Sequence, residues 1–266
     1  AVLIPETSDG RLLFAIPWHG RVVVGTTDVP VSQPELEPEA LDEEIEFLLE
    51  HSSKMFSRTL TRHDVRSVFV GIRPLVRREG SESTQSVSRR HELIVSRSGL
   101  VTMTGGKWTI YRKMAEDAVN AAVRVAGLPD RPSRTHGRKL HGSAVKHGDR
   151  RDGSVYGSDA VGIDELIELE PQWDRRIHPR LSLREVEVIW AVRHEMARTV
   201  EDVLSRRTRS LLLDAHATIE AAPAVARLMS RELKKDENWV SAQIRAFREI
   251  AVRYCLDPAH PGETTE

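Results

Sequence analysis

The sequence predicts an α+β protein, because strand-like and helix-like hydrophobic periods occupy different parts of the chain. Short runs rich in β-branched residues alternate with turn residues up to Thr104. From Trp108 onward, apolar residues recur at three- and four-residue spacing instead. A length of 266 residues suffices for about two domains, each with its own core. We therefore expect an antiparallel sheet followed by an all-α bundle.

The first part of the chain is expected to form a sheet of about five strands with one helix inserted. Residues 11–16 and 21–26 are strand-like, and Pro17-Trp18-His19-Gly20 between them has the composition of a hairpin turn. A helix is predicted over 38–56, where apolar residues follow helical spacing and acidic residues occupy the first turns. The remaining strands are expected at 65–72, 92–96 and 100–104.

A strand is predicted to turn into a helix across Gly105-Gly106, and Gly127 followed by Pro129 stops that helix. Residues 130–157 have the Pro, Gly, Ser and charge content of a linker. We therefore place one domain at 1–129 and a helical domain at 158–260. Its helices are expected at 159–170, 183–204, 211–217, 223–235 and 239–254.

The bulk composition excludes several classes of partner. The chain has 39 basic and 40 acidic side chains, so no overall field attracts nucleic acid or anionic lipid. The single cysteine, Cys255, cannot form an internal disulfide, and no segment resembles a secretory signal, so we expect a cytoplasmic location. The apolar runs are too short to span a bilayer, which leaves only peripheral membrane contact. No metal is expected, because the linker histidines lack cysteine or carboxylate partners at ligand spacing.

The segment from Gly105 to Arg112 is the strongest candidate for a binding site. Lys107 and Thr109 stand at the mouth of a predicted helix, where unpaired N–H groups and the helix dipole favour an anion. Gly105-Gly106 would let a ligand approach the backbone closely. The alternative is that these glycines only make a tight turn. The spacing does not fit a Walker motif.

Two arginines are candidates for phosphate recognition. Pro74 disfavours helical backbone at Arg73, so the guanidinium leaves an extended chain in a form suited to bidentate binding of phosphate. The alternative is a surface ion pair at a strand end. Arg89 is followed directly by Arg90, and such a pair is usually a solvated edge.

These segments occur in an order that resembles the aerobic, FAD-dependent glycerol-3-phosphate dehydrogenase family. Residues 185–209 resemble that family's helical C-terminal domain, so the resemblance covers nearly the whole chain. It identifies the first domain as a substrate-binding sheet with the last strand and helix of the FAD domain. The matching motifs are Asp9-Gly10-Arg11, Pro17-Trp18, Gly25-Thr26-Thr27-Asp28, Gly71-Ile72-Arg73-Pro74-Leu75, Ser88-Arg89 and Gly105–Arg112.

The resemblance implies oxidation of sn-glycerol 3-phosphate to dihydroxyacetone phosphate, with electrons passing through FAD to quinone. Arg73 and Arg89 match the family's phosphate-binding arginines. Lys107 and Thr109 match residues beside both flavin and substrate, where a cation stabilises negative charge. Gly105 and Gly106 match the backbone of the cofactor loop.

One family feature is absent, because the sequence contains no G-x-G-x-x-G motif. We therefore expect the N-terminal FAD-binding region to be missing, so that this chain alone retains no FAD and has no turnover. The family's general base is not identified here. His91 is the nearest local candidate, although a histidine beside two arginines is more often a solvated or core-edge residue.

Two alternatives to a quinone-linked dehydrogenase stay open. An oxidase that passes electrons to oxygen would share every visible motif, and the isolated chain could be a non-catalytic folding or interaction module. The expected partners are glycerol 3-phosphate, quinone and the missing FAD-binding region, with a second copy of the chain as a further candidate. Peripheral attachment to the inner face of the cell membrane is the alternative placement.

Overall fold

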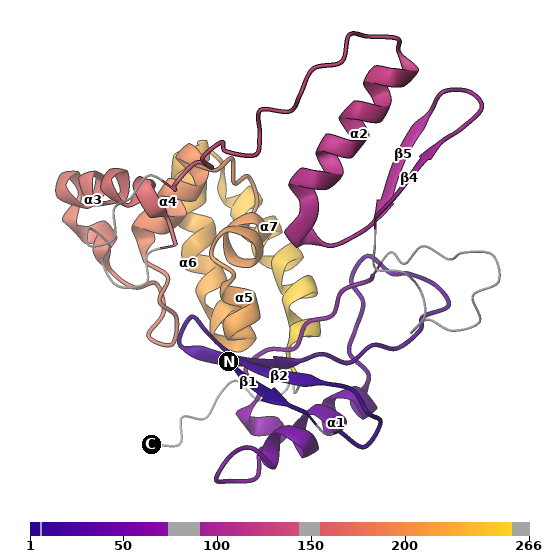
Figure 1. Cartoon of the computed structure of the whole chain (residues 1–266). Coiled ribbons are helices and arrows are strands. Elements are labelled where there is room, and N and C mark those ends of the chain that lie inside the picture. Colours follow the sequence, from indigo (N-terminus) through magenta and orange to yellow (C-terminus); the bar gives the residue numbers. More distant parts are fainter. Residues whose placement is uncertain (6, 74–90, 144–154, 257–266) are drawn as a thin grey trace. The chain divides into compact units, whose positions relative to one another are not determined.

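The computed structural model describes residues 1–5, 7–73, 91–143 and 155–256 (Figure 1). The chain is α+β, and its contacts divide it into two compact units. The first unit contains residues 1–29, 33–70 and 145–266, and the second contains 30–32 and 71–144. These units group residues by contact and not by continuity of the chain. The domain boundaries expected from the sequence, at 129 and 157, stay a prediction.

The sheet of the first unit has three antiparallel strands in the order β1-β2-β3 (Figure 1). They are β1 (Val2–Ile4), β2 (Leu13–Trp18) and β3 (Arg21–Gly25). His19 and Gly20 both have positive φ, at 46° and 74°. A two-residue turn of this hand matches the twist of the flanking strands. The predicted hairpin is therefore confirmed.

The two faces of this sheet differ in burial. Successive side chains of a strand point to opposite faces, and Ile4, Leu13 and Ala15 are buried. Leu3 pairs with Phe14 across the other face, and both side chains are more than 40% exposed. One face of the sheet therefore contributes to a core, and the other is apolar but open.

Helix α1 (Asp42–Ser53) lies beside this sheet, inside the range predicted for it (Figure 1). His51 is 1% exposed and links the two, because its Nε2 accepts a hydrogen bond of 2.9 Å from the amide of Ser8. Its Nδ1 lies 2.9 Å from the carbonyl of Phe47, so both ring nitrogens have partners. A buried polar ring is tolerated when it is satisfied in this way.

The strand predicted at 65–72 is not formed. The backbone of this segment instead pairs with ends of helices in the same unit: the amide of Val68 donates to the carbonyl of Tyr254, and the carbonyl of Arg66 accepts from the amide of Ala215, each at 2.9 Å. The first amides of a helix have no intrahelical partner, which makes them available for such contacts. The expected five-stranded sheet is therefore wrong, and the described residues form one sheet of three strands and one of two.

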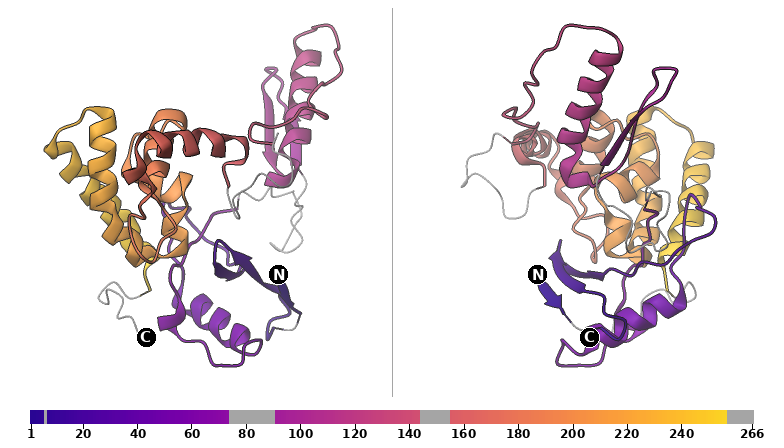
Figure 2. Two further views of the ribbon diagram at one scale, coloured as in Figure 1. Left: turned by 90° about the vertical axis from the view of Figure 1, so that its left-hand side faces the viewer. Right: turned by 45° about the vertical axis from the view of Figure 1, so that its right-hand side comes forward.

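The helical part of the first unit is an all-α bundle, as predicted. Its long helices α6 and α7 are consecutive and pack side by side, in orange and yellow in Figure 2. Alanines at 217, 221, 222 and 226 are buried on α6, and small side chains allow close approach of neighbouring helices. The helices are α3 (Ala160–Leu169), α4 (Glu185–His194), the π-helical turn η6 (Asp202–Arg207), α5 (Ser210–Leu213), α6 (Ala215–Leu233) and α7 (Glu237–Ala251).

Three predicted helices have the wrong extent. The helix expected at 211–217 is interrupted at Asp214, so its residues are divided between α5 and α6. The helix expected at 183–204 ends at His194, because Met196 adopts a left-handed conformation and the amide of Ala197 closes onto the carbonyl of Ala191. The helix expected to start at Pro223 starts at Ala215, where Asp214 Oδ1 accepts from the amide of Ala217 at 2.9 Å. Pro223 is therefore an interior residue of α6.

We expect Gly162→Ala to destabilise the first unit by about 1–3 kcal/mol. A Cβ at this position would lie 2.8 Å from the Trp190 ring, which is 8% exposed and stacks on His194. Alanine normally stabilises a helix by about 1 kcal/mol relative to glycine, so the steric term must exceed that gain. Urea unfolding of both proteins measures the difference.

The matched control is a double-mutant cycle with Trp190→Phe, which removes the ring atoms that clash. The steric account requires Gly162→Ala to be much less harmful in the Trp190→Phe background. Equal costs in both backgrounds would contradict it.

Candidate functional site

The candidate site lies in the second unit, at the junction between a hairpin and a helix. Strands β4 (His91–Val95) and β5 (Val101–Gly105) form an antiparallel pair, as predicted. A short 3-10 turn, η3 (Trp108–Ile110), leads from β5 into α2 (Tyr111–Val125), and α2 packs against both strands. The register pairs His91 with Gly105, so the start of β4 lies beside the glycine loop.

Gly106 allows close packing at this junction because it has no side chain. Its φ is +78°, and Gly105 before it is also positive at +71°. A Cβ on Gly106 would lie 2.6 Å from Met114 Sδ and 3.2 Å from His91 Cβ. The backbone conformation therefore favours glycine at this position, and an added Cβ would also force the end of the Met114 side chain to move. The loop is a tight turn, and its predicted contact with a cofactor stays a prediction.

Lys107 and Thr109 are exposed at the start of this turn. The carbonyl of Lys107 accepts a hydrogen bond of 3.0 Å from the amide of Ile110. Lys107 has a φ of −136°, so its own backbone is extended and it lies just before the helical turn. Within the part of the chain that the structure describes, neither side chain has a hydrogen-bond or ion-pair partner. An ammonium group and a hydroxyl therefore stand unpaired where a helix begins, which is a suitable place for an anion.

His91 takes part in a charged network with α2. Its Nε2 lies 2.9 Å from Asp117 Oδ2, and Lys113 Nζ lies 2.8 Å from Asp117 Oδ1. Lys113 also contacts Glu116, which pairs with Arg112. The hydrogen bond from Lys113 lowers the pKa of Asp117, and that from Arg112 lowers the pKa of Glu116.

The hydrogen bond to Asp117 holds His91 by Nε2, and Nδ1 has no hydrogen-bond partner among the described residues. A carboxylate on one imidazole nitrogen is an arrangement that orients a histidine base. The hydrogen bond between His91 and Asp117 also connects β4 to α2, which is a structural role. The catalytic role of His91 therefore stays a prediction.

Of the two predicted phosphate-binding arginines, only Arg73 lies within the described residues. Arg73 is exposed at the end of the described segment 7–73 and belongs to the second unit. Arg89 lies outside the described residues. The structure thus brings His91 together with Gly105, Gly106, Lys107 and Thr109.

The partners Asp117 and Met114 were not predicted from the sequence. Arg112 and Lys113 precede Glu116 and Asp117 at helical spacing, so the ion pairs within α2 could have been found. The contact with His91 depends on packing between segments far apart in sequence.

Two further properties concern only the described residues. They contain no group of three His, Cys, Asp or Glu side chains placed to hold a metal ion. None of their helices combines the length and the apolar composition needed to cross a bilayer.

Two known families match the chain. The family described as the C-terminal domain of alpha-glycerophosphate oxidase matches residues 103–240, and the FAD dependent oxidoreductase family matches residues 2–112. The first match alone covers more than half of the chain.

The similar curated proteins are dehydrogenases. A probable mitochondrial glycerol-3-phosphate dehydrogenase of Caenorhabditis elegans is 37% identical over 273 residues, and the mitochondrial glycerol-3-phosphate dehydrogenase of Homo sapiens is 36% identical over 271. Each alignment covers 94% of this chain and 37% of the relative. The chain therefore spans little more than a third of the length of these proteins.

A solved structure has the same fold over most of the chain. It is the crystal structure of the glycerol-3-phosphate dehydrogenase from Bacillus halodurans complexed with FAD. The TM-score is 0.68 at 25% identity, covering 96% of this chain and 53% of that one. The resemblance predicted from the order of motifs is confirmed by these matches.

We expect Gly106→Ala to destabilise the second unit by about 2–4 kcal/mol, because it combines a left-handed backbone with the close contact to Met114 and His91. Thermal and urea unfolding measure the loss.

Gly127→Ala is the matched control. Gly127 also has positive φ, at +63°, but a Cβ added there would have no atom within 4 Å. The free energy of unfolding of Gly127→Ala should fall by only about 1 kcal/mol, which is the cost of placing alanine in a left-handed backbone conformation. Equal losses in the two variants would show that the close contact at Gly106 has no effect.

Proposed function

We propose, from the premise that this chain belongs to the family of the C-terminal domain of alpha-glycerophosphate oxidase, that it is part of an FAD-dependent glycerol-3-phosphate dehydrogenase. The whole protein would oxidise sn-glycerol 3-phosphate to dihydroxyacetone phosphate. The match of residues 2–112 to FAD dependent oxidoreductases and the names of the curated relatives support this proposal. Because the chain spans 37% of those relatives, the remaining machinery would lie in sequence outside it.

The observation that carries the proposal is the unpaired pair of Lys107 and Thr109 beside the Gly105-Gly106 turn. All their side-chain groups and the nearby backbone amides are hydrogen-bond donors or can act as donors. Such a set fits an anion, whether a substrate phosphate or the electron-rich pyrimidine edge of a flavin. The chemistry of these residues is therefore compatible with FAD.

FAD supplies the hydride acceptor when it is bound. Lys107 would place a positive charge against the anionic edge of the cofactor, and Thr109 would donate a hydrogen bond there. Arg73 and Arg89 would hold the substrate phosphate through paired N–H donors. The sequence has no G-x-G-x-x-G motif, so the adenosine diphosphate part of FAD would be held by residues outside this chain.

The electron acceptor has two candidates. Quinone in the membrane is the proposed acceptor, since the similar proteins carry the name dehydrogenase. Oxygen is the alternative, because the matching C-terminal family is described by an oxidase. Release of hydrogen peroxide by the whole enzyme in air would favour oxygen, and its absence, together with quinone reduction, would favour the dehydrogenase.

Arg73→Ala in the whole protein should raise KM for glycerol 3-phosphate by about tenfold or more, because a charge-assisted phosphate contact is lost. Turnover of glycerol, which has no phosphate, should change little. Steady-state kinetics with both substrates measure the two effects. Arg97→Ala, an exposed arginine in the β4–β5 turn, is the control and should leave both unchanged. Equal effects of Arg73→Ala on the two substrates would refute a phosphate-binding role.

The 266-residue chain alone should bind no flavin, because Lys107 and Thr109 would form only part of the site. Purification in the presence of FAD, followed by an absorbance spectrum, tests this. A yellow cofactor retained after gel filtration would contradict the division of the site. The chain would then act as a complete flavin-binding module.

A further inference from the structure

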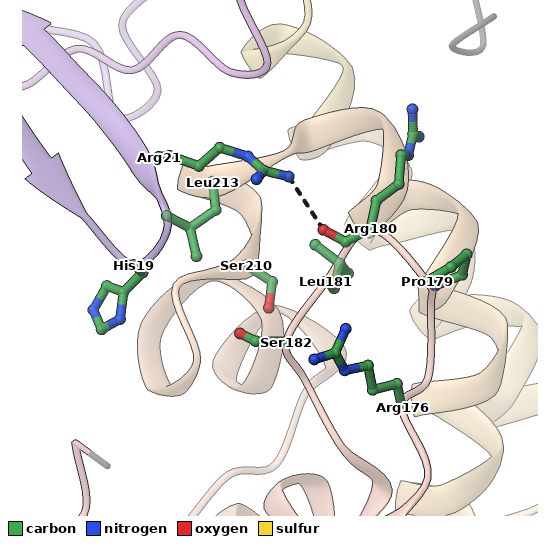
Figure 3. A pocket seen from close by; sticks show the side chains of 9 residues that line it. All are labelled: His19, Arg21, Arg176, Pro179, Arg180, Leu181, Ser182, Ser210 and Leu213. Atoms are coloured by element: carbon green, nitrogen blue, oxygen red, sulfur yellow. Dashed lines mark hydrogen bonds between the residues drawn. The ribbon is translucent and has the colours of Figure 1, made fainter. Parts of the chain in front are cut away.

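A pocket of about 300 Å³ lies entirely within the first unit, next to the β2–β3 hairpin and α5. Figure 3 shows Arg21 and Arg176 on different sides of it, with Ser182 and Ser210 toward the middle. Its other lining residues are His19, Pro179, Arg180, Leu181 and Leu213. None of these residues belongs to the motifs that carry the resemblance to the dehydrogenase family.

The loop that carries Arg176 and Ser182 is well anchored. Leu181 and Leu183 are 4% and 2% exposed in the core, and the amide of Ile177 donates to the carbonyl of Leu183 at 3.0 Å. Arg176 and Arg184 form a backbone bridge across its base. The loop is therefore a small closed turn that presents its side chains at fixed positions.

Arg21 is held at the pocket by contacts with the helical part. Its Nη2 donates to the carbonyl of Arg180 at 3.3 Å, as drawn in Figure 3, and lies 3.9 Å from Asp214 Oδ2. Arg180 Nε lies 3.8 Å from the same oxygen. The Asp214 side chain is only 2% exposed, so a buried carboxylate fixes the arginines in place.

Both a donor and an acceptor at the pocket are buried without a hydrogen-bond partner among the described residues. Arg21 Nε is buried without a hydrogen-bond partner, and Asp214 Oδ2 likewise has none at hydrogen-bond distance. Within the described ranges, Arg176 and Ser182 have no side-chain partner, and Ser210 shares its hydroxyl with Thr208 at 2.9 Å.

The charges around the pocket do not balance. Arg180 is also 3.4 Å from Glu220. Among the described residues, Glu220 and Asp214 therefore place two carboxylates against the three guanidinium groups of the pocket. Arg176 carries the uncompensated charge. Arginines are the side chains best suited to bind phosphate through paired N–H groups.

We propose that this pocket binds a phosphate dianion, either inorganic phosphate or the phosphate group of a small monoester. Arg176 provides the uncompensated positive charge, Arg21 provides an N–H donor, and Ser182 provides a hydroxyl. Leu181, Leu213 and Pro179 give the pocket an apolar part that can contact a short carbon chain. The site is separate from the one proposed around Lys107 and does not depend on it.

Titration of the 266-residue chain with inorganic phosphate, at ionic strength held constant with sodium chloride, tests the proposal. Phosphate should raise Tm in a saturable way and shift the NMR signal of the Arg21 Nε–H group. Arg176→Ala should weaken binding by about tenfold or more. Because Arg176 is exposed, the Tm of the Arg176→Ala variant without phosphate should equal the wild-type value.

Two variants serve as controls. Arg245→Ala removes an exposed arginine of α7 that does not line the pocket and should bind phosphate as the wild type does. Lys107→Ala removes the donor of the other proposed site and should leave the Arg21 signal response intact. The proposal is overturned if phosphate causes no saturable response, or if Arg176→Ala binds it unchanged. Loss of the response in Lys107→Ala alone would assign phosphate binding to the second unit instead.

Discussion

The first unit depends on the burial of one carboxylate, Asp214, at the point where three segments meet. One oxygen caps α6 through the amide of Ala217, an interaction that contributes about 1 kcal/mol in typical helices. The other oxygen faces Arg21 of the hairpin and Arg180 of the 176–182 loop. A buried carboxylate without opposite charge nearby costs several kcal/mol, so the two arginines are required where they are. The docking of the small sheet on the helices and the start of α6 therefore share one electrostatic cause.

The second unit depends on a steric condition. Gly106 lets β5, η3 and α2 follow one another within a few residues, with Met114 and His91 filling the space where a side chain would stand. The result is a short, fixed distance between the last strand residue and the helix start. The position of Lys107 and Thr109 follows from this packing and not from contacts of their own, which leaves their polar groups available.

Local rules predicted part of the fold and of the site. The His19-Gly20 turn and the β4–β5 hairpin follow from residue types next to each other in sequence. The strand expected at 65–72 failed, because its apolar pattern serves contacts with the ends of helices. Pro223 was predicted to begin a helix, but the cap at Asp214 places the start of α6 at Ala215. Lys107 was predicted from the glycines before it, whereas Asp117, the partner of His91, required knowledge of packing.

The open apolar face of the β1–β3 sheet affects how the chain behaves while it folds. Leu3, Phe14 and Ile16 form an apolar surface on strands, and such surfaces pair with copies of themselves when they are left in water. Self-association rises with concentration. The yield of native protein on refolding should therefore fall as the concentration of the chain increases, even though the hydrogen bonds within the sheet are unchanged.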